Sequence, residues 1–201
     1  MKMSKKLVLV VFAAGAFATS NAQFQFGVKA GANFATQSGR DAGDAKTLVG
    51  VNFGAFLKLP MAPGLSLQPE LMYSGQGAHY DVSNGTLNEH ANYINIPVLF
   101  KFSHGSGFYA ETGPQFGFLV SAKSNVAGTS TDAKSAYNSG DFAWVFGIGY
   151  KIPQSPVGID FRYNIGLANV EDRSTTGGNY SWRNDVLQLG LTYVLFSSSR
   201  R

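Results

Sequence analysis

The sequence contains no cysteine, which excludes disulfide bonds, cysteine-ligated zinc and thiol catalysis from this chain. It is also poor in charge: Asp, Glu, Lys and Arg make up only 14% of its 201 residues, whereas a soluble domain usually carries about a quarter. Aromatic residues, in contrast, reach 13%, and glycine occurs 24 times. This composition is unusual for a protein whose whole surface meets water.

A strong excess of one charge sign is missing as well. The net charge is +4, but Lys2, Lys5 and Lys6 all lie in the first six positions. Without them, 13 basic residues face 12 acidic ones, a balance of +1. The charge pattern therefore gives no reason to expect nucleic-acid binding.

Long apolar runs are rare too. The only long run, LVLVVFAAGAFA at 7–18, has 12 residues, whereas a membrane-spanning helix needs about 20. Basic residues precede it, and the small residues Ser20 and Ala22 follow it, which is typical of a signal peptide cleaved after Ala22. An uncleaved anchor is the alternative. We expect a cleaved signal peptide over 1–22, a β-barrel domain over 23–196 for the reasons given below, and a polar C-terminal tail over 197–201.

Alternation with a period of two dominates the rest of the chain. In FQFGVKAGANFA at 24–35, every even position is apolar and every odd position is polar or small, which predicts a β-strand with two different faces. Segments of this length fit strands that cross a bilayer at a tilt. Eight segments follow the pattern: 24–35, 48–59, 65–80, 91–102, 108–123, 141–152, 157–170 and 182–196.

The connections between these segments alternate in length. Three are tight, at 60–64, 103–107 and 153–156. Four are longer and polar, at 36–47, 81–90, 124–140 and 171–181, and the third of these, rich in Ser, Ala, Gly and Thr, is predicted to be mobile. An even strand count with alternating short and long connections predicts an all-β, eight-stranded antiparallel up-and-down transmembrane β-barrel, with both chain ends on the short-turn side.

Composition indicates which face points outward. The polar face holds mostly Gly, Asn, Gln, Ser and Ala, whereas the exterior of a soluble barrel should be dense in charge. The apolar face carries too much aromatic bulk for the interior of eight strands, so we expect Phe116, Phe142 and Phe161 to meet lipid. A soluble β-sandwich or lipocalin-like barrel is the alternative. Pro69, Pro97 and Pro114 fall inside predicted strands, where each removes a donor from the hydrogen-bond ladder, and bulges or kinks are predicted there.

Four segments resemble a known family. LQPELMYSGQGA (67–78), YINIPVLFKF (93–102), GFYAETGPQFGFLVSAK (107–123) and DFRYNIGLANV (160–170) are similar to PorT-like, porin-family outer-membrane β-barrel proteins. The resemblance runs from about Phe24 to Phe196. It implies an integral barrel in the outer membrane of a Gram-negative envelope, assembled by the barrel-assembly machinery, and it implies no catalytic residues.

Charged residues on the inward face form the strongest candidate site. All lie in the short-turn half of the predicted barrel, and buried ions require partners, so we expect a network of ion pairs and hydrogen bonds that plugs the lumen. An ion or proton path is the alternative, and a catalytic pair made by Glu70 and Glu111 is a weaker one. The predicted network contains Lys29, Lys58, Glu70, Lys101, Glu111, Lys151, Asp160 and Arg162.

Aromatic residues are also expected to form girdles at the two membrane interfaces. Trp144 and Trp182 lie near the long-loop ends of their predicted strands. Phe102, Phe108, Tyr150 and Tyr193 lie near the short-turn ends.

The three histidines have no motif spacing. His79 and His90 flank one long loop beside Asp81 and Glu89, where a surface metal site is conceivable. A lipid A-modifying hydrolase would instead use His90 with Ser74 or Ser83 as nucleophile. Ordinary loop histidines are the default interpretation, so no catalytic, cofactor or metal residue is assigned and no cofactor is expected.

The predicted function is therefore that of a structural or interaction scaffold in the outer membrane, presenting four loops on a plugged barrel. Its expected partners are outer-membrane lipid, the barrel-assembly machinery and an envelope or secretion-system protein. A small pore and a lipid-modifying enzyme remain as alternatives.

Overall fold

The computed structural model describes residues 24–40, 45–82, 85–126, 129–170 and 182–198. The predicted signal peptide, the loop at 171–181 and most of the predicted tail lie outside the described residues. None of the described residues forms a helix long and apolar enough to cross a bilayer.

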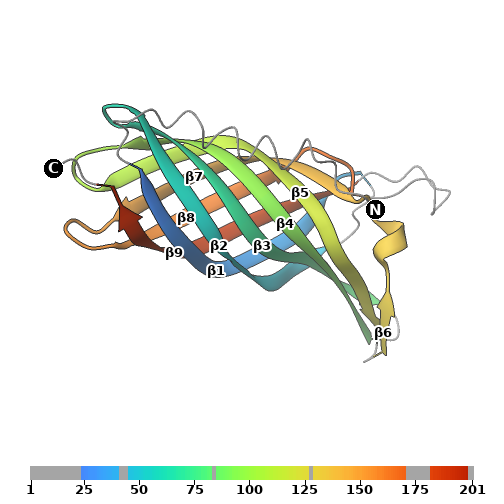
Figure 1. Ribbon diagram of the computed structural model, residues 1–201. Helices are drawn as coiled ribbons and strands as arrows, with labels where there is room; N and C mark the ends of the chain where they lie inside the picture. The colour runs from blue at the N-terminus through green and yellow to red at the C-terminus, as the bar shows by residue number, and fades with distance from the viewer. Residues whose placement is uncertain (1–23, 41–44, 83–84, 127–128, 171–181, 199–201) are drawn as a thin grey trace.

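Nine strands and one short helix make up the described chain (Figure 1). Eight of the strands pair antiparallel in the ring β1-β2-β3-β4-β5-β7-β8-β9, and β9 returns to β1, so the described sheet has no open edge within this ring. This confirms the predicted eight-stranded up-and-down barrel. The elements are β1 (Gln25–Ser38), β2 (Lys46–Ala62), β3 (Leu65–Val82), β4 (Gly85–Ser103), β5 (Phe108–Val126), β6 (Thr129–Asp132), the 3₁₀-helix η1 (Lys134–Ala136), β7 (Gly140–Lys151), β8 (Val157–Gly166) and β9 (Arg183–Ser197).

Two of the predicted long loops contain regular structure instead. β3 and β4 stay paired up to Val82 and Gly85, and β5 continues to pair with β4 as far as Val126. β6 then pairs with the end of β5. We call residues 79–82, 85–91, 119–126 and 129–132 the extension, a four-stranded sheet that projects past the ends of β7 and β8 at the lower right of Figure 1.

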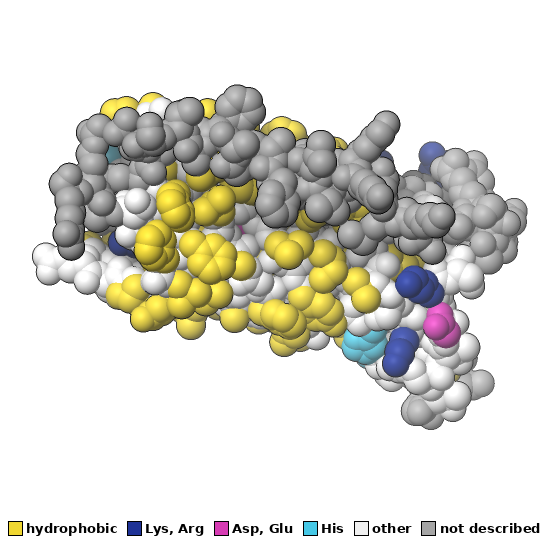
Figure 2. Space-filling view, viewed as in Figure 1, with side chains coloured by type: hydrophobic (Ala, Val, Ile, Leu, Met, Phe, Trp, Pro, Cys, Tyr) yellow, Lys and Arg dark blue, Asp and Glu magenta, His cyan; other side chains and the backbone are white. Residues whose placement is uncertain are grey.

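The two faces of the barrel follow the predicted alternation. Phe116 and Phe161 are 47% and 43% exposed, whereas Lys101 and Asp160 are 7% and 1% exposed. On the face in view, Figure 2 shows outward apolar side chains as a broad band over the middle of the barrel, which we call the apolar belt. So much aromatic and aliphatic surface is stable only against hydrocarbon, and a closed ring leaves no backbone edge unpaired there.

Three aromatic side chains lie inside the barrel, although we expected the bulky aromatic residues to face outward. Phe56, Tyr93 and Tyr109 are buried on the inward face. Two of them lie against a glycine that is their direct partner on the next strand: Phe56 pairs with Gly27, and Tyr109 pairs with Gly149. A Cβ atom at Gly27 would come within 2.4 Å of the Phe56 ring. The inward glycines thus supply the space that these rings occupy.

No bulge occurs at the strand prolines, so the prediction of bulges there is wrong, and the predicted kinks stay a prediction. β2 and β3 keep one register from the pair Phe56–Glu70 to the pair Leu59–Leu67, on both sides of Pro69. The registers around Pro97 and Pro114 are likewise unbroken. Proline removes a donor but its fixed φ suits an extended chain, so a ladder bond is lost without an extra residue being inserted.

Candidate functional site: the lumen and its two ends

Six of the eight predicted inward charges meet in the middle of the lumen. Arg162 on β8 donates from Nη1 and Nη2 to Glu70 on β3, at 2.7 and 2.6 Å, which ties opposite walls of the barrel. Its Nε donates to Glu111 on β5 at 2.5 Å. All of these groups are buried. We call Lys29, Glu70, Lys101, Glu111, Asp160 and Arg162 the lumen cluster.

The remaining members complete the charge balance of the lumen cluster. Lys29 Nζ lies 2.7 Å from Asp160 Oδ2, and Lys101 Nζ lies 3.4 Å from Glu111 Oε2. Three cations therefore face three carboxylates, and the formal charge of the lumen cluster is zero. Paired ions of this kind fill the interior without leaving a buried charge uncompensated.

Lys58 and Lys151, the other two predicted members, lie closer to the short-turn end. Lys58 Nζ is 3.5 Å from Ser103 Oγ. In the described part of the chain, neither lysine has a carboxylate oxygen within 4.0 Å. The structure therefore divides the predicted set into a balanced cluster and two cations at the end of the barrel.

A layer of amides lies on the long-loop side of the lumen cluster. Asn33 donates to Ser74 Oγ at 2.9 Å, and its own Oδ1 accepts from Asn52 at 2.7 Å and from Gln188 at 2.9 Å. These side chains come from β1, β2, β3 and β9. Sequence reasoning placed small polar residues inside the barrel but did not single out Asn33 as their centre.

Apolar side chains cover the long-loop end of the lumen. Tyr137, which follows η1, packs against Tyr93, Leu119 and Val170, and Trp182 packs against the same group. The Tyr137 hydroxyl donates to Glu89 Oε2 on β4 at 2.7 Å, and burial raises the pKa of this tyrosine well above its ordinary value. We call this buried group, Ala91, Tyr93, Leu119, Ala122, Tyr137 and Val170, the apolar lid.

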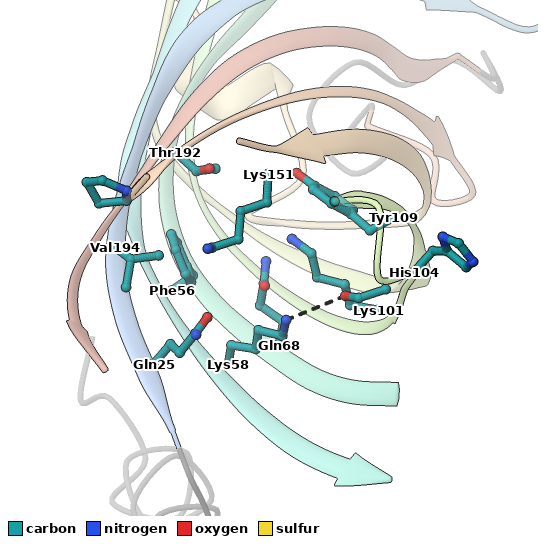
Figure 3. Close-up of a pocket in the computed structure, with 13 residues that line it drawn as sticks. Gln25, Phe56, Lys58, Gln68, Lys101, His104, Tyr109, Lys151, Thr192 and Val194 are labelled. Atoms are coloured by element: carbon teal, nitrogen blue, oxygen red, sulfur yellow. Dashed lines mark hydrogen bonds between the residues drawn. The ribbon is translucent and has the colours of Figure 1, made fainter. Parts of the chain in front are cut away.

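The short-turn end is hollow. A cavity of about 100 Å³ opens there, and Figure 3 shows Lys58, Lys101 and Lys151 reaching into it from three different strands. Tyr109 lines the same cavity, with Lys101 Nζ 3.5 Å from the centre of its ring. We call this cavity the mouth; its lining is Gln25, Phe56, Lys58, Gln68, Lys101, Ser103, His104, Gly107, Tyr109, Lys151, Pro156, Thr192 and Val194.

The extension carries exposed charges. Lys46 on β2 forms an ion pair with Asp81 on β3, and this hydrogen bond lowers the pKa of the Asp81 carboxyl below its usual value. His79 bridges Asn88 Oδ1 at 2.6 Å and Asp81 Oδ1 at 3.3 Å. Figure 2 shows basic, acidic and histidine side chains gathered at this end, beyond the apolar belt.

Of the residues weighed for metal binding, His79 and Asp81 are in contact, but they do not belong to a larger cluster of metal-binding side chains in the described chain. No group of three or more His, Asp or Glu side chains in the described chain could hold a metal ion. Ser74 is buried in the amide layer, where it accepts from Asn33 and from Gln76. Ser83 lies outside the described residues.

The predicted girdle residues take different positions. Phe102, Phe108 and Tyr193 are exposed on the outer wall, and Tyr150 is half-buried, its ring 4.8 Å from that of Phe108. Trp144 points outward, with its Nε1 donating to Thr112 Oγ1 at 2.9 Å. Trp182 instead packs against the apolar lid, and its carbonyl oxygen accepts from the backbone N–H of Val170, a member of that lid, at 3.1 Å.

Comparison with known proteins identifies what this architecture is similar to. The family described as "Outer membrane protein beta-barrel domain" matches residues 17–172. The crystal structure of Neisserial surface protein A superposes with a TM-score of 0.54 at 17% identity, covering 84% of this chain and 96% of that one. Ail, the attachment invasion locus protein of Yersinia pestis, gives 0.46 at 12% identity, covering 88% and 100%. No curated protein matches the chain.

Proposed function

The chain belongs to the outer membrane protein beta-barrel domain family and is an integral outer-membrane protein, and from that premise we propose that it is an interaction scaffold. In this proposal the extension binds a protein or glycan component of the envelope or cell surface, and the barrel only anchors it. Within the family we group the chain with PorT-like proteins, on the four sequence segments named above.

The observation that carries this proposal is the contrast between the lumen and the extension. The lumen is filled by the lumen cluster, the amide layer and the apolar lid. The extension, in contrast, projects paired strands past the barrel rim on the long-loop side, which faces outward in barrels of this class. A sheet can pair with a strand of a partner along an exposed edge, or it can present side chains to that partner.

The proposed partners fall into three groups. Outer-membrane lipid contacts the apolar belt, and the barrel-assembly machinery inserts the chain. An envelope or secretion-system protein is the proposed ligand of the extension, where exposed Asp81 and half-buried His79 offer polar contacts beside exposed Lys46 on β2.

Site-specific crosslinking in cells tests the proposal. Because the chain has no cysteine, a single Thr86→Cys or Ser130→Cys variant carries a photo-crosslinker only on the exposed extension. We expect a discrete adduct from both positions. Ser106→Cys, exposed in a short turn, is the matched control and should not give that adduct. The absence of an adduct from the extension, or the same adduct from Ser106→Cys, would refute the interaction role.

A further inference from the structure

The mouth holds more positive charge than the lumen can balance. Every carboxylate of the lumen cluster already faces a cation of that cluster. Lys58 and Lys151 add two positive charges at the mouth, and no Asp or Glu occurs among the described residues that line it. A cation enclosed by protein on several sides is costly unless an anion accompanies it.

The size and charge of the mouth select the ligand. We propose that the mouth binds a phosphate group, held by Lys58, Lys101 and Lys151. The cavity of about 100 Å³ is larger than the minimum for one water by several-fold, and lysine is a common phosphate ligand as a point charge. Two unbalanced lysines match the charge of a phosphate dianion better than that of a single carboxylate.

The phosphate group has two sources, a free phosphate compound in the periplasm or the headgroup of an inner-leaflet phospholipid. Short turns of outer-membrane barrels face the periplasm, so both reach the mouth. The site lies at the opposite end of the barrel from the extension and does not depend on the interaction role proposed above.

Binding of inorganic phosphate to the full-length protein, folded in a zwitterionic detergent, tests the site. We expect saturable binding to one site, and a dissociation constant raised about tenfold or more in Lys58→Gln/Lys151→Gln, since two charge-assisted contacts are lost. Lys123→Gln/Lys134→Gln, which removes two exposed lysines at the other end, is the matched control and should bind as the parent does. Heat-modifiable migration on gels verifies that each variant is folded.

Nanodiscs distinguish the two sources. If a lipid headgroup occupies the site, phosphatidylglycerol nanodiscs should abolish binding of inorganic phosphate to the parent protein, whereas phosphatidylcholine nanodiscs should not. If a free compound occupies it, both nanodiscs should leave the binding intact. Non-saturable binding, or equal binding by Lys58→Gln/Lys151→Gln and the parent, would overturn the proposal.

Discussion

Arg162 is the residue on which the interior depends most, because it is fully enclosed and contacts two carboxylates at once. Its guanidinium spans the lumen from β8 to β3 and β5, so that three strands share one cation. Its five donors suit this bidentate arrangement, which a lysine cannot reproduce.

Removing this cation should be costly. Arg162→Met leaves Glu70 and Glu111 buried without their main partner, and we expect the free energy of unfolding to fall by about 3–5 kcal/mol. Urea titration of the folded protein in detergent measures this change. Arg162→Lys should lower the free energy of unfolding by a smaller amount, because lysine keeps the positive charge. Arg183→Met, an exposed position on β9, is the control, and a loss there as large as at Arg162 would contradict the assigned role.

Asp81 provides a residue-scale test on the extension. The hydrogen bond from Lys46 lowers the pKa of its carboxyl, so the ion pair is fully formed above the ordinary pKa of aspartate and is lost as the pH falls through the lowered value. In Lys46→Gln the pKa of Asp81 should rise toward its ordinary value, as followed by NMR titration. Lys123→Gln should leave it unchanged; an equal rise in both variants would rule out this pairing.

At the scale of elements, much of the fold could be predicted, because a period of two marks both the strands and their inward faces. This pattern placed eight charges on the inward face, and six of them meet in the lumen cluster. The pattern does not report side-chain volume on the neighbouring strand, so the pairing of Tyr109 with Gly149 was missed. The parts of the extension beyond the predicted strands were missed. In β6, every residue of TSTD is polar, and pairing with β5 rather than an apolar stripe determines its structure.

Next to the extension, the pairing of β3 with β4 requires a glycine. Gly77 has φ +142°, and a Cβ atom there would come 1.8 Å from the carbonyl oxygen of Glu89 on β4. Gly77→Ala should therefore destabilise the protein by about 1–3 kcal/mol and speed amide exchange near Glu89. Gly75→Ala is a matched control two residues away, where the nearest contacts are an ordinary 3.4 Å. Equal effects of the two substitutions would argue against this close approach.

At the scale of the whole molecule, the barrel is filled rather than open. An eight-stranded barrel has an interior just wide enough for side chains, and here ions, amides and the apolar lid occupy successive layers. The belt of lipid-facing side chains and the closed ring make the barrel an anchor in the membrane, and the mouth and the extension are its two accessible ends.

This filling predicts no conductance. Purified protein in planar bilayers should give no discrete current steps, because the lumen cluster and the apolar lid both block the path of an ion through the lumen. The same preparation should migrate differently on gels before and after boiling, as a closed barrel does. Discrete steps from heat-modifiable protein would show that the lumen conducts and would restore the pore hypothesis.

The ion pair between Lys29 and Asp160 has a consequence for how the protein is made. Lys29 lies on the first strand and Asp160 on the next-to-last strand, with β9 between them. Before β9 pairs with β1 and β8, Lys29 and Asp160 lie on the two edge strands of an open sheet and do not form their ion pair. Membrane insertion and seam closure should therefore coincide, so that no half-inserted intermediate accumulates.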